Sequence, residues 1–250
     1  MSARGRHSDK ARLDQILVQR GLAGSREKAK AIIMAGLVEV DGVRVEKAGT
    51  LISGGASITL KKKGSPYVSR GGLKLEEALR HFSVRIQDLV LLDVGASTGG
   101  FTDCLLQNGA RRVISVDVGY GQFDWKLRHD PRVKLLEKTN IRHLKPGDLE
   151  GPIHGAVIDV SFISLRLVIP PVSNLLTPHS FMIPLIKPQF EVGKGRVGKG
   201  GVVRNPVLHR EVLEGLTAFF RESGWRVEGH IPSPLLGPKG NREFLTYLTR

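Results

Sequence analysis

Residues 91–122 of this chain read LLDVGASTGGFTDCLLQNGARRVISVDVGYGQ, and this stretch decides the fold. Its pattern predicts a strand, a glycine-rich turn, a helix and a second strand, at Leu89–Val94, Gly95–Gly100, Phe101–Asn108 and Arg112–Val118. Asp117 lies near the end of the second strand. A carboxylate in that place can bind two ribose hydroxyls. The stretch therefore predicts a pocket for a cofactor that carries adenosine.

The spacing of the glycines indicates which cofactor this pocket takes. A dinucleotide site needs Gly-x-Gly-x-x-Gly to place a pyrophosphate at the helix amino terminus. The run from Gly95 to Gly100 is GASTGG, which lacks the second glycine of that pattern. Asp93 places a negative charge beside the turn, which suits a cationic sulfonium with an amino-acid tail better than a pyrophosphate. An ordinary α/β turn without a ligand is the alternative.

The motif DVGASTGGFT resembles the first motif of S-adenosylmethionine (SAM) methyltransferases that act on RNA ribose. The resemblance implies SAM as the cofactor. The candidate cofactor-binding residues are Asp93, Gly95, Ala96, Ser97, Thr98, Gly99, Gly100, Phe101, Asp117 and, as a looser candidate on the adenine side, Asn140.

Composition restricts the class of protein further. The 250 residues carry a formal net charge of +14, which favours a polyanionic partner, nucleic acid first, over a generically basic protein. The single cysteine, Cys104, excludes an internal disulfide and a four-cysteine zinc site, and the histidines show no metal-ligand spacing. We find no secretory signal and no apolar run near 18 residues, so we expect a cytoplasmic protein without a membrane span or a metal.

Residues 1–63 carry half of this net positive charge and predict a small α+β domain. We expect helices over Ala11–Arg20 and from Ser25 to Gly36, a hairpin turn at Asp41-Gly42, and a strand over Ala56–Leu60. This order resembles the S-four-type RNA-binding domain, and the alternative is a solvated basic helix face. The candidate RNA-binding residues are Arg12, Arg20, Arg26, Lys28, Lys30 and, beyond this domain, Arg70.

Residues 64–70 are expected to be a linker, and residues 71–250 a second domain. Strand and helix patterns alternate there, which predicts a mostly parallel sheet that binds its ligand at the carboxyl ends of the strands. Four charged residues fall near such ends or on the first helix: Lys74, Asp159, Lys187 and Glu243. The fold class is therefore α/β, a Rossmann-like sheet preceded by a small α+β domain.

The segments SRGGLKLEEAL, IDVSFISL, LIKPQFE and NREF, with the glycine motif, resemble RNA ribose 2′-O-methyltransferases of the FtsJ-like group. With its N-terminal domain, the whole chain resembles the TlyA family, whose members carry a haemolysin label and methylate ribosomal RNA. The resemblance maps a catalytic tetrad onto Lys74, Asp159, Lys187 and Glu243. The resemblance implies that Lys187 takes or relays the proton of the ribose hydroxyl. It also implies that Asp159 and Glu243 orient Lys187, and that Lys74 helps to fix the hydroxyl.

The expected activity is therefore SAM-dependent methylation of the ribose 2′-oxygen of a cytidine in ribosomal RNA. The expected partner is the ribosomal RNA within ribosomal subunits, and the enzyme is expected to be a monomer. One alternative is an RNA-binding assembly factor that keeps the methyltransferase fold without turnover. A membrane-lytic protein is the other, and the chain offers no basic amphipathic helix with an aromatic face to support it. Residues 193–200, GKGRVGKG, approach a phosphate-binding loop but lack its Ser or Thr, so we interpret them as a basic loop near the substrate.

Overall fold

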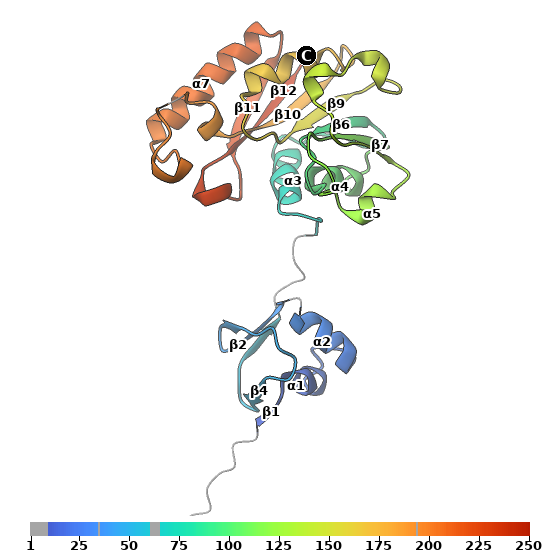
Figure 1. Ribbon diagram of the computed structural model, residues 1–250, viewed down its shortest axis with the longest axis vertical. Coiled ribbons are helices and arrows are strands. Elements are labelled where there is room, and N and C mark those ends of the chain that lie inside the picture. Colours follow the sequence, from blue (N-terminus) through green and yellow to red (C-terminus); the bar gives the residue numbers. More distant parts are fainter. Residues whose placement is uncertain (1–9, 35, 61–65, 194) are drawn as a thin grey trace, which may run out of the picture. The chain divides into compact units, whose positions relative to one another are not determined.

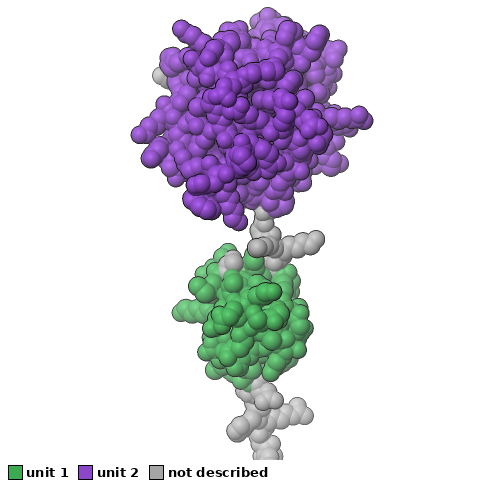
Figure 2. All heavy atoms as spheres, turned by 90° about the vertical axis from the view of Figure 1, so that its right-hand side faces the viewer, with its two compact units in different colours: residues 1–64 green, residues 65–250 purple. Residues whose placement is uncertain are grey.

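The computed structural model describes residues 10–34, 36–60, 66–193 and 195–250. The chain divides into two compact units, unit 1 within Met1–Gly64 and unit 2 within Ser65–Arg250. Figure 1 shows the elements of each unit and Figure 2 shows their atoms. The lysines at 61–63, which end the predicted first domain, lie outside the described residues.

Unit 1 is a small α+β domain. Its elements are, in order, β1 (Lys10–Arg12), α1 (Leu13–Gln19), α2 (Arg26–Met34), β2 (Val38–Val40), β3 (Val43–Arg44), β4 (Leu51–Ser53) and β5 (Ile58–Leu60). The helices bury Leu13, Leu17, Ala29 and Ile33 completely, which are the apolar positions at helical spacing. The Ser25 hydroxyl accepts a hydrogen bond from the Lys28 amide at 3.2 Å, as expected of a helix cap.

The strands of unit 1 differ from the expected arrangement. The helix was expected from Ala11, but Lys10–Arg12 instead pairs with Leu51–Ser53 as a separate two-stranded sheet, while β3, β2 and β5 form the other sheet. Strands of two or three residues show too little alternation to be recognised from sequence. The expected hairpin turn is present, because Asp41 and Gly42 both have left-handed backbones, with φ of 50° and 79°.

Unit 2 is built on a seven-stranded sheet in the order β11-β12-β10-β9-β6-β7-β8. Its strands are β6 (Val90–Val94), β7 (Arg112–Val116), β8 (Val133–Leu136), β9 (Gly155–Ile158), β10 (Phe181–Ile186), β11 (Arg226–Pro232) and β12 (Phe244–Thr249). Its α-helices are α3 (Gly71–His81), α4 (Gly100–Gln107), α5 (Trp125–Arg128), α6 (Ile169–Ser173) and α7 (Pro206–Glu222). Short 3-10 helices are η1 (Ile141–His143), η2 (Pro146–Asp148), η3 (Leu165–Leu167), η4 (Pro188–Phe190), η5 (Lys199–Gly201) and η6 (Pro238–Gly240).

Helices cover both faces of this sheet (Figure 1). Alternate strand residues such as Leu91, Val113 and Ile183 pack with α3 and α4 on one face. Their neighbours, such as Leu92 and Ile114, pack with α6 and α7 on the other. Burial on both faces explains why the strands are continuous apolar runs. The predicted fold class, a Rossmann-like sheet with an N-terminal α+β domain, is confirmed.

The strand order fixes where a ligand can bind. The strands β8, β7, β6, β9 and β10 are parallel, and the direction of connection reverses between β6 and β9. A crevice opens at such a reversal, outside the carboxyl ends of the strands. Strand β12 is antiparallel to β10, with Phe244 opposite Ile186, so β12 begins at that same edge. The residues that precede β12 therefore reach the crevice.

The segment expected as a linker is partly packed on unit 2. The Val68 amide donates to Asp103 Oδ2 at 2.8 Å, and the Gln107 side chain donates to the Pro66 carbonyl at 3.0 Å. Pro66 and Val68 are thus bonded to α4.

Candidate active site

Two adjoining cavities open at the carboxyl ends of β6 and β9. The first, the lysine cavity, has a volume of about 270 Å³ and is lined by residues that include Ser69, Arg70, Lys74, Ala96, Thr98, Gly100, Phe101, Asp159, Lys187, Leu235, Leu236, Gly237, Pro238 and Glu243. The second, the Asp117 cavity, has a volume of about 480 Å³ and is lined by residues that include Asp117, Gly119, Gln122, Thr139, Asn140, Ser161 and Phe162. Gly95, Ser97 and Asp159 line both cavities, so they meet around the glycine turn.

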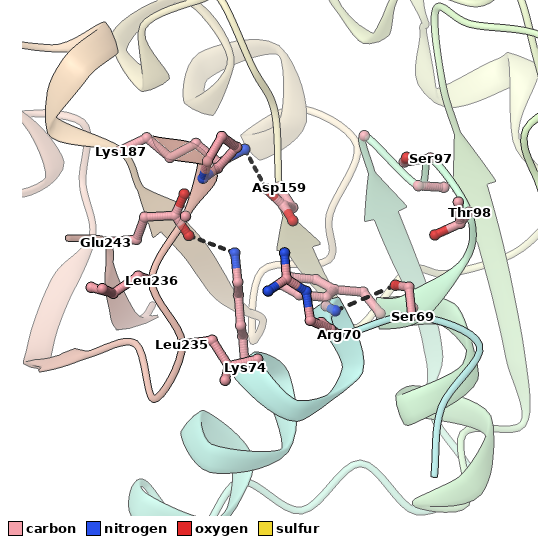
Figure 3. A pocket seen from close by; sticks show the side chains of 17 residues that line it. Ser69, Arg70, Lys74, Ser97, Thr98, Asp159, Lys187, Leu235, Leu236 and Glu243 are labelled. Carbon is pink, nitrogen blue, oxygen red and sulfur yellow. Dashed lines mark hydrogen bonds and ion pairs between the residues drawn. The ribbon is translucent and has the colours of Figure 1, made fainter. Parts of the chain in front are cut away.

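The four predicted tetrad residues come together in the lysine cavity as two ion pairs (Figure 3). Lys74, from the first turn of α3, lies with its Nζ 2.5 Å from Glu243 Oε2. Lys187, which follows β10, lies with its Nζ 2.6 Å from Asp159 Oδ1, which follows β9. Four segments distant in sequence thus contribute two cations and two anions to one site.

Burial makes this charge set unusual. Glu243 is 1% exposed and Lys187 is 8% exposed, although charged residues are seldom buried unless they are paired. The second carboxylate oxygen of Glu243, Oε1, is buried and has no hydrogen-bond partner among the residues that the structure describes. A buried polar atom without a partner is rare in proteins.

Ser161 is a member of the site that the sequence analysis missed. The Lys187 ammonium donates a hydrogen bond to Ser161 Oγ at 2.9 Å, so Asp159 and Ser161, from the same loop, both hold Nζ. The sequence did contain a signal for Ser161, because it lies two residues after the predicted tetrad member Asp159 in the motif IDVSF.

The glycine turn brings the ends of β6 and β9 into close contact. Gly95 has a left-handed backbone, with φ of 83°, and a Cβ there would lie 2.5 Å from the Asp159 carbonyl oxygen. The amides of Ser97 and Gly119 donate to the two oxygens of Asp117, at 2.7 and 2.6 Å. The turn therefore fixes the carboxylate that the sequence assigns to a ribose.

The other predicted cofactor residues divide by position. Asp93 is fully buried and lines neither cavity. Its Oδ2 accepts a hydrogen bond from the Thr102 hydroxyl at 2.6 Å, its Oδ1 has no hydrogen-bond partner among the described residues, and burial raises its pKa to about 7. Gly99 lies at the amino end of α4, where a Cβ would meet Leu127 at 2.6 Å. Asn140 lines the Asp117 cavity and caps η1 by accepting the Arg142 amide at 3.1 Å.

The predicted RNA-binding arginines of unit 1 carry structural contacts. Arg12 and Arg26 both bond the fully buried Asp14, at 3.0 and 3.3 Å, and the Arg12 guanidinium lowers the pKa of that carboxyl to about 2. Arg20 donates to the carbonyls of Ala56 and Gly54, at 2.8 and 2.6 Å.

Lys28 and Lys30 lie outside the buried face of α2, and the Nζ of Lys30 is 3.7 Å from a carboxylate oxygen of Glu27. Arg70 of unit 2 lines the lysine cavity. Within the described ranges, no group of three or more His, Cys, Asp or Glu residues is arranged to hold a metal, and no helix is long and apolar enough to cross a membrane.

The sheet is doubly wound and has a glycine turn after β6 and a carboxylate, Asp117, placed to bind a ribose. Beside them lies a cavity in which two lysines are each paired with a carboxylate. These features are those of a Rossmann-like methyltransferase. Residues 67–250 match the model of the FtsJ-like methyltransferase family, and residues 11–58 match that of the S4 domain. The chain belongs to the FtsJ-like methyltransferases, in the TlyA group that carries an S4 domain.

Individual relatives agree with this assignment. The chain is 45% identical over 240 residues to the 16S/23S rRNA (cytidine-2′-O)-methyltransferase TlyA of Mycobacterium tuberculosis. The match covers 96% of this chain and 90% of that protein. It is 39% identical over 237 residues to Hemolysin A of Brachyspira hyodysenteriae, covering 94% and 98%. A solved structure from Streptococcus thermophilus, which also carries a hemolysin name, matches 98% of this chain and 90% of its own, with a TM-score of 0.75 and 46% identity.

Proposed function

We propose that this enzyme transfers a methyl group from SAM to the ribose 2′-oxygen of a cytidine in ribosomal RNA. The observation that carries the proposal is the lysine cavity, where Lys187 is held by Asp159 and Ser161 beside a second pair, Lys74 and Glu243. The nucleotide and the RNA come from the name of the M. tuberculosis relative.

The residues around the glycine turn fit SAM. Asp117 would hold the ribose hydroxyls, and the walls of its cavity, among them Asn140 and Ile141, would surround the adenine. Gly95 and Ser97 line both cavities, so a cofactor that extends along the turn leads from one to the other. When bound, SAM supplies an electrophilic methyl group on a sulfonium.

The tetrad supplies proton transfer and positioning. A ribose hydroxyl is a poor nucleophile until its proton leaves, and Lys187 takes or relays that proton at Nζ. The resulting ammonium is stabilised by Asp159, which already lies 2.6 Å away. Lys74, fixed by Glu243, donates a hydrogen bond to the reacting oxygen. Holding the oxygen in line with the methyl group supplies much of the remaining rate.

We propose that residues 1–63 dock the RNA and that residues 71–250 carry out the transfer, in the cytoplasm, where ribosomal subunits are available. Lys28 and Lys30 are the unit 1 candidates that can contact phosphates without giving up a structural role, because Arg12, Arg20 and Arg26 already bond Asp14 or backbone carbonyls. A variant with both lysines changed to glutamine should bind subunits more weakly and with a shallower salt dependence.

The test is transfer of a tritiated methyl group from SAM to ribosomal subunits that lack the modification. Wild type should place counts in alkali-resistant dinucleotides, which marks a blocked 2′-oxygen. Lys187→Met should lower the rate by about 10²- to 10⁴-fold, the usual contribution of a general base, while its Kd for SAM stays unchanged. The matched control is Lys134→Met, on β8, whose ammonium pairs with Glu150 away from both cavities. Counts in a base instead of a ribose, or full activity of Lys187→Met, would refute the proposal.

A further inference from the structure

A buried asparagine joins two loops at the rim of the lysine cavity. Asn241 is 3% exposed, and all of its side-chain contacts are to backbone groups of these loops. Its Oδ1 accepts the Val203 amide at 3.0 Å. Its Nδ2 donates to the Gly201 carbonyl at 3.0 Å and to the Pro238 carbonyl at 3.1 Å. The segments 195–205 and 233–242, which contain η5 and η6, therefore form one structure, which we call the double loop.

The double loop adjoins the reacting groups. Leu235, Leu236, Gly237 and Pro238 form a wall of the lysine cavity, and Figure 3 shows Leu235 and Leu236 beside Glu243 and Lys74. The Ser233 amide also donates to the Glu243 carbonyl at 2.8 Å. One segment of the double loop, 233–242, is thus part of the cavity wall. The other segment, 195–205, is joined to it through Asn241.

The double loop carries only positive charge. Neither segment contains Asp or Glu. Arg196 pairs with Glu211 on α7, but Lys199, Arg204, Lys239 and Arg242 are exposed, and none lies within ion-pair distance of a carboxylate among the residues described. Lys239 also reaches toward η5, because its Nζ is 3.9 Å from the point where a Cβ on Gly201 would lie. Four cations without an ion-pair partner among the described residues, on two joined loops, attract a polyanion.

Several residues of the double loop have left-handed backbones. Lys239 has a left-handed backbone, with φ of 59°, and Gly200, Gly201 and Gly240 have φ between 78° and 85°. Such a backbone is uncommon at a residue with a Cβ. Lys239 directly follows Pro238, which lines the lysine cavity.

We propose that the double loop binds the phosphates that flank the methylated nucleotide, with Lys199 and Lys239 as the principal contacts. This inference rests on the proposed function, since it places the target ribose in the lysine cavity. Phosphate contacts carry no base information and fix register along the strand. The double loop would therefore select which ribose enters the cavity and leave the base to other groups.

The experiment compares two variants that each remove two positive charges. One is Lys199→Gln with Lys239→Gln. The control is Arg85→Gln with Arg111→Gln, because these exposed residues precede β6 and β7 at the opposite edge of the sheet. Affinity for unmodified ribosomal subunits is measured from 50 to 200 mM KCl, together with the KM for subunits and the Kd for SAM.

The lysine variant should lower the slope of log K against log salt by about 2 and weaken binding roughly tenfold at 50 mM salt, because two phosphate contacts are lost. Its KM should rise in parallel while the Kd for SAM does not change. The inference is overturned if the lysine variant and the control have equal slopes and equal KM. Failure of the proposed function is a separate result, since wild type itself would then place no counts on a ribose.

Asn241→Ala tests independently whether the hydrogen bonds of Asn241 hold the two segments of the double loop together. Hydrogen exchange at the Val203 amide, whose acceptor is Asn241 Oδ1, should accelerate together with exchange at the amides of Lys239 and Gly240. Exchange that accelerates in only one segment, or in neither, contradicts a single double loop.

Discussion

Replacement of Lys74 by methionine tests whether the tetrad is a coupled buried charge set. The Glu243 side chain is fully buried, and its Oε2 bonds Lys74, while its Oε1 has no hydrogen-bond partner among the described residues. Lys74→Met keeps the aliphatic length of the side chain but leaves this carboxylate unpaired. Breaking a buried pair on one side costs about 3–5 kcal/mol. For a domain the size of unit 2, such a loss lowers Tm by roughly 10 °C.

The double variant Lys74→Met with Glu243→Gln separates this effect from ordinary loss of packing. Removing both charges of a buried pair is often nearly neutral, so the double variant should recover most of the stability that Lys74→Met loses. Unfolding is followed in urea by tryptophan fluorescence. The chain has two tryptophans, Trp125 and Trp225, and both lie in unit 2, so unit 1 does not contribute. A double variant as unstable as Lys74→Met would refute the coupling, as would a Lys74→Met loss below about 0.5 kcal/mol, the range of ordinary surface substitutions.

Three further predictions concern the turn and its surroundings. Gly95→Ala should lose SAM binding and destabilise unit 2 well beyond its control, Gly121→Ala. Both glycines have positive φ, but of the two only a Cβ at residue 95 would meet backbone atoms. Equal losses of Tm in the two variants would contradict this. Burial raises the pKa of Asp93 to about 7, so the folded state holds its proton above the ordinary pKa near 4. The stability of unit 2 should therefore fall as pH rises from about 4 to 7, more steeply than in Asp93→Asn, and parallel Tm–pH curves would dismiss the idea. Ser161→Ala should lower kcat about tenfold, as expected for loss of one orienting hydrogen bond of about 1.4 kcal/mol, and should leave the KM for SAM unchanged. It should also shift the pH–rate profile. An unchanged pH–rate profile would show that Ser161 does not position Lys187.

Much of the arrangement was available from sequence because it depends on local rules. Alternating strands and helices imply a parallel sheet with its ligand at the carboxyl ends, and the family match and the observed sheet agree with that expectation. The glycine turn and Asp117 follow from a motif of contiguous residues, and their backbone contacts are short-range. The resemblance to FtsJ-like enzymes also indicated Lys74, Asp159, Lys187 and Glu243, which do meet in one cavity.

Other features depend on contacts between distant segments, which no local pattern contains. The pairing of Lys10–Arg12 with Leu51–Ser53 is one, and the engagement of Arg12 and Arg26 by a buried Asp14 is another. The charge of an arginine is visible in sequence, but whether it faces solvent or a carboxylate depends on packing.

The sequence by itself determined the class of sheet and the glycine turn, because those depend on periodicity and on residue type, and its resemblance to FtsJ-like enzymes indicated the four charged residues. Only the tertiary structure decided how the charges pair: Lys74 with Glu243, 169 residues away, and Lys187 with Asp159 and Ser161. It also decided that Asn241 joins two basic loops at the cavity rim. Pairing follows from which strand ends share an edge, and Glu243 reaches that edge because β12 adds antiparallel to β10.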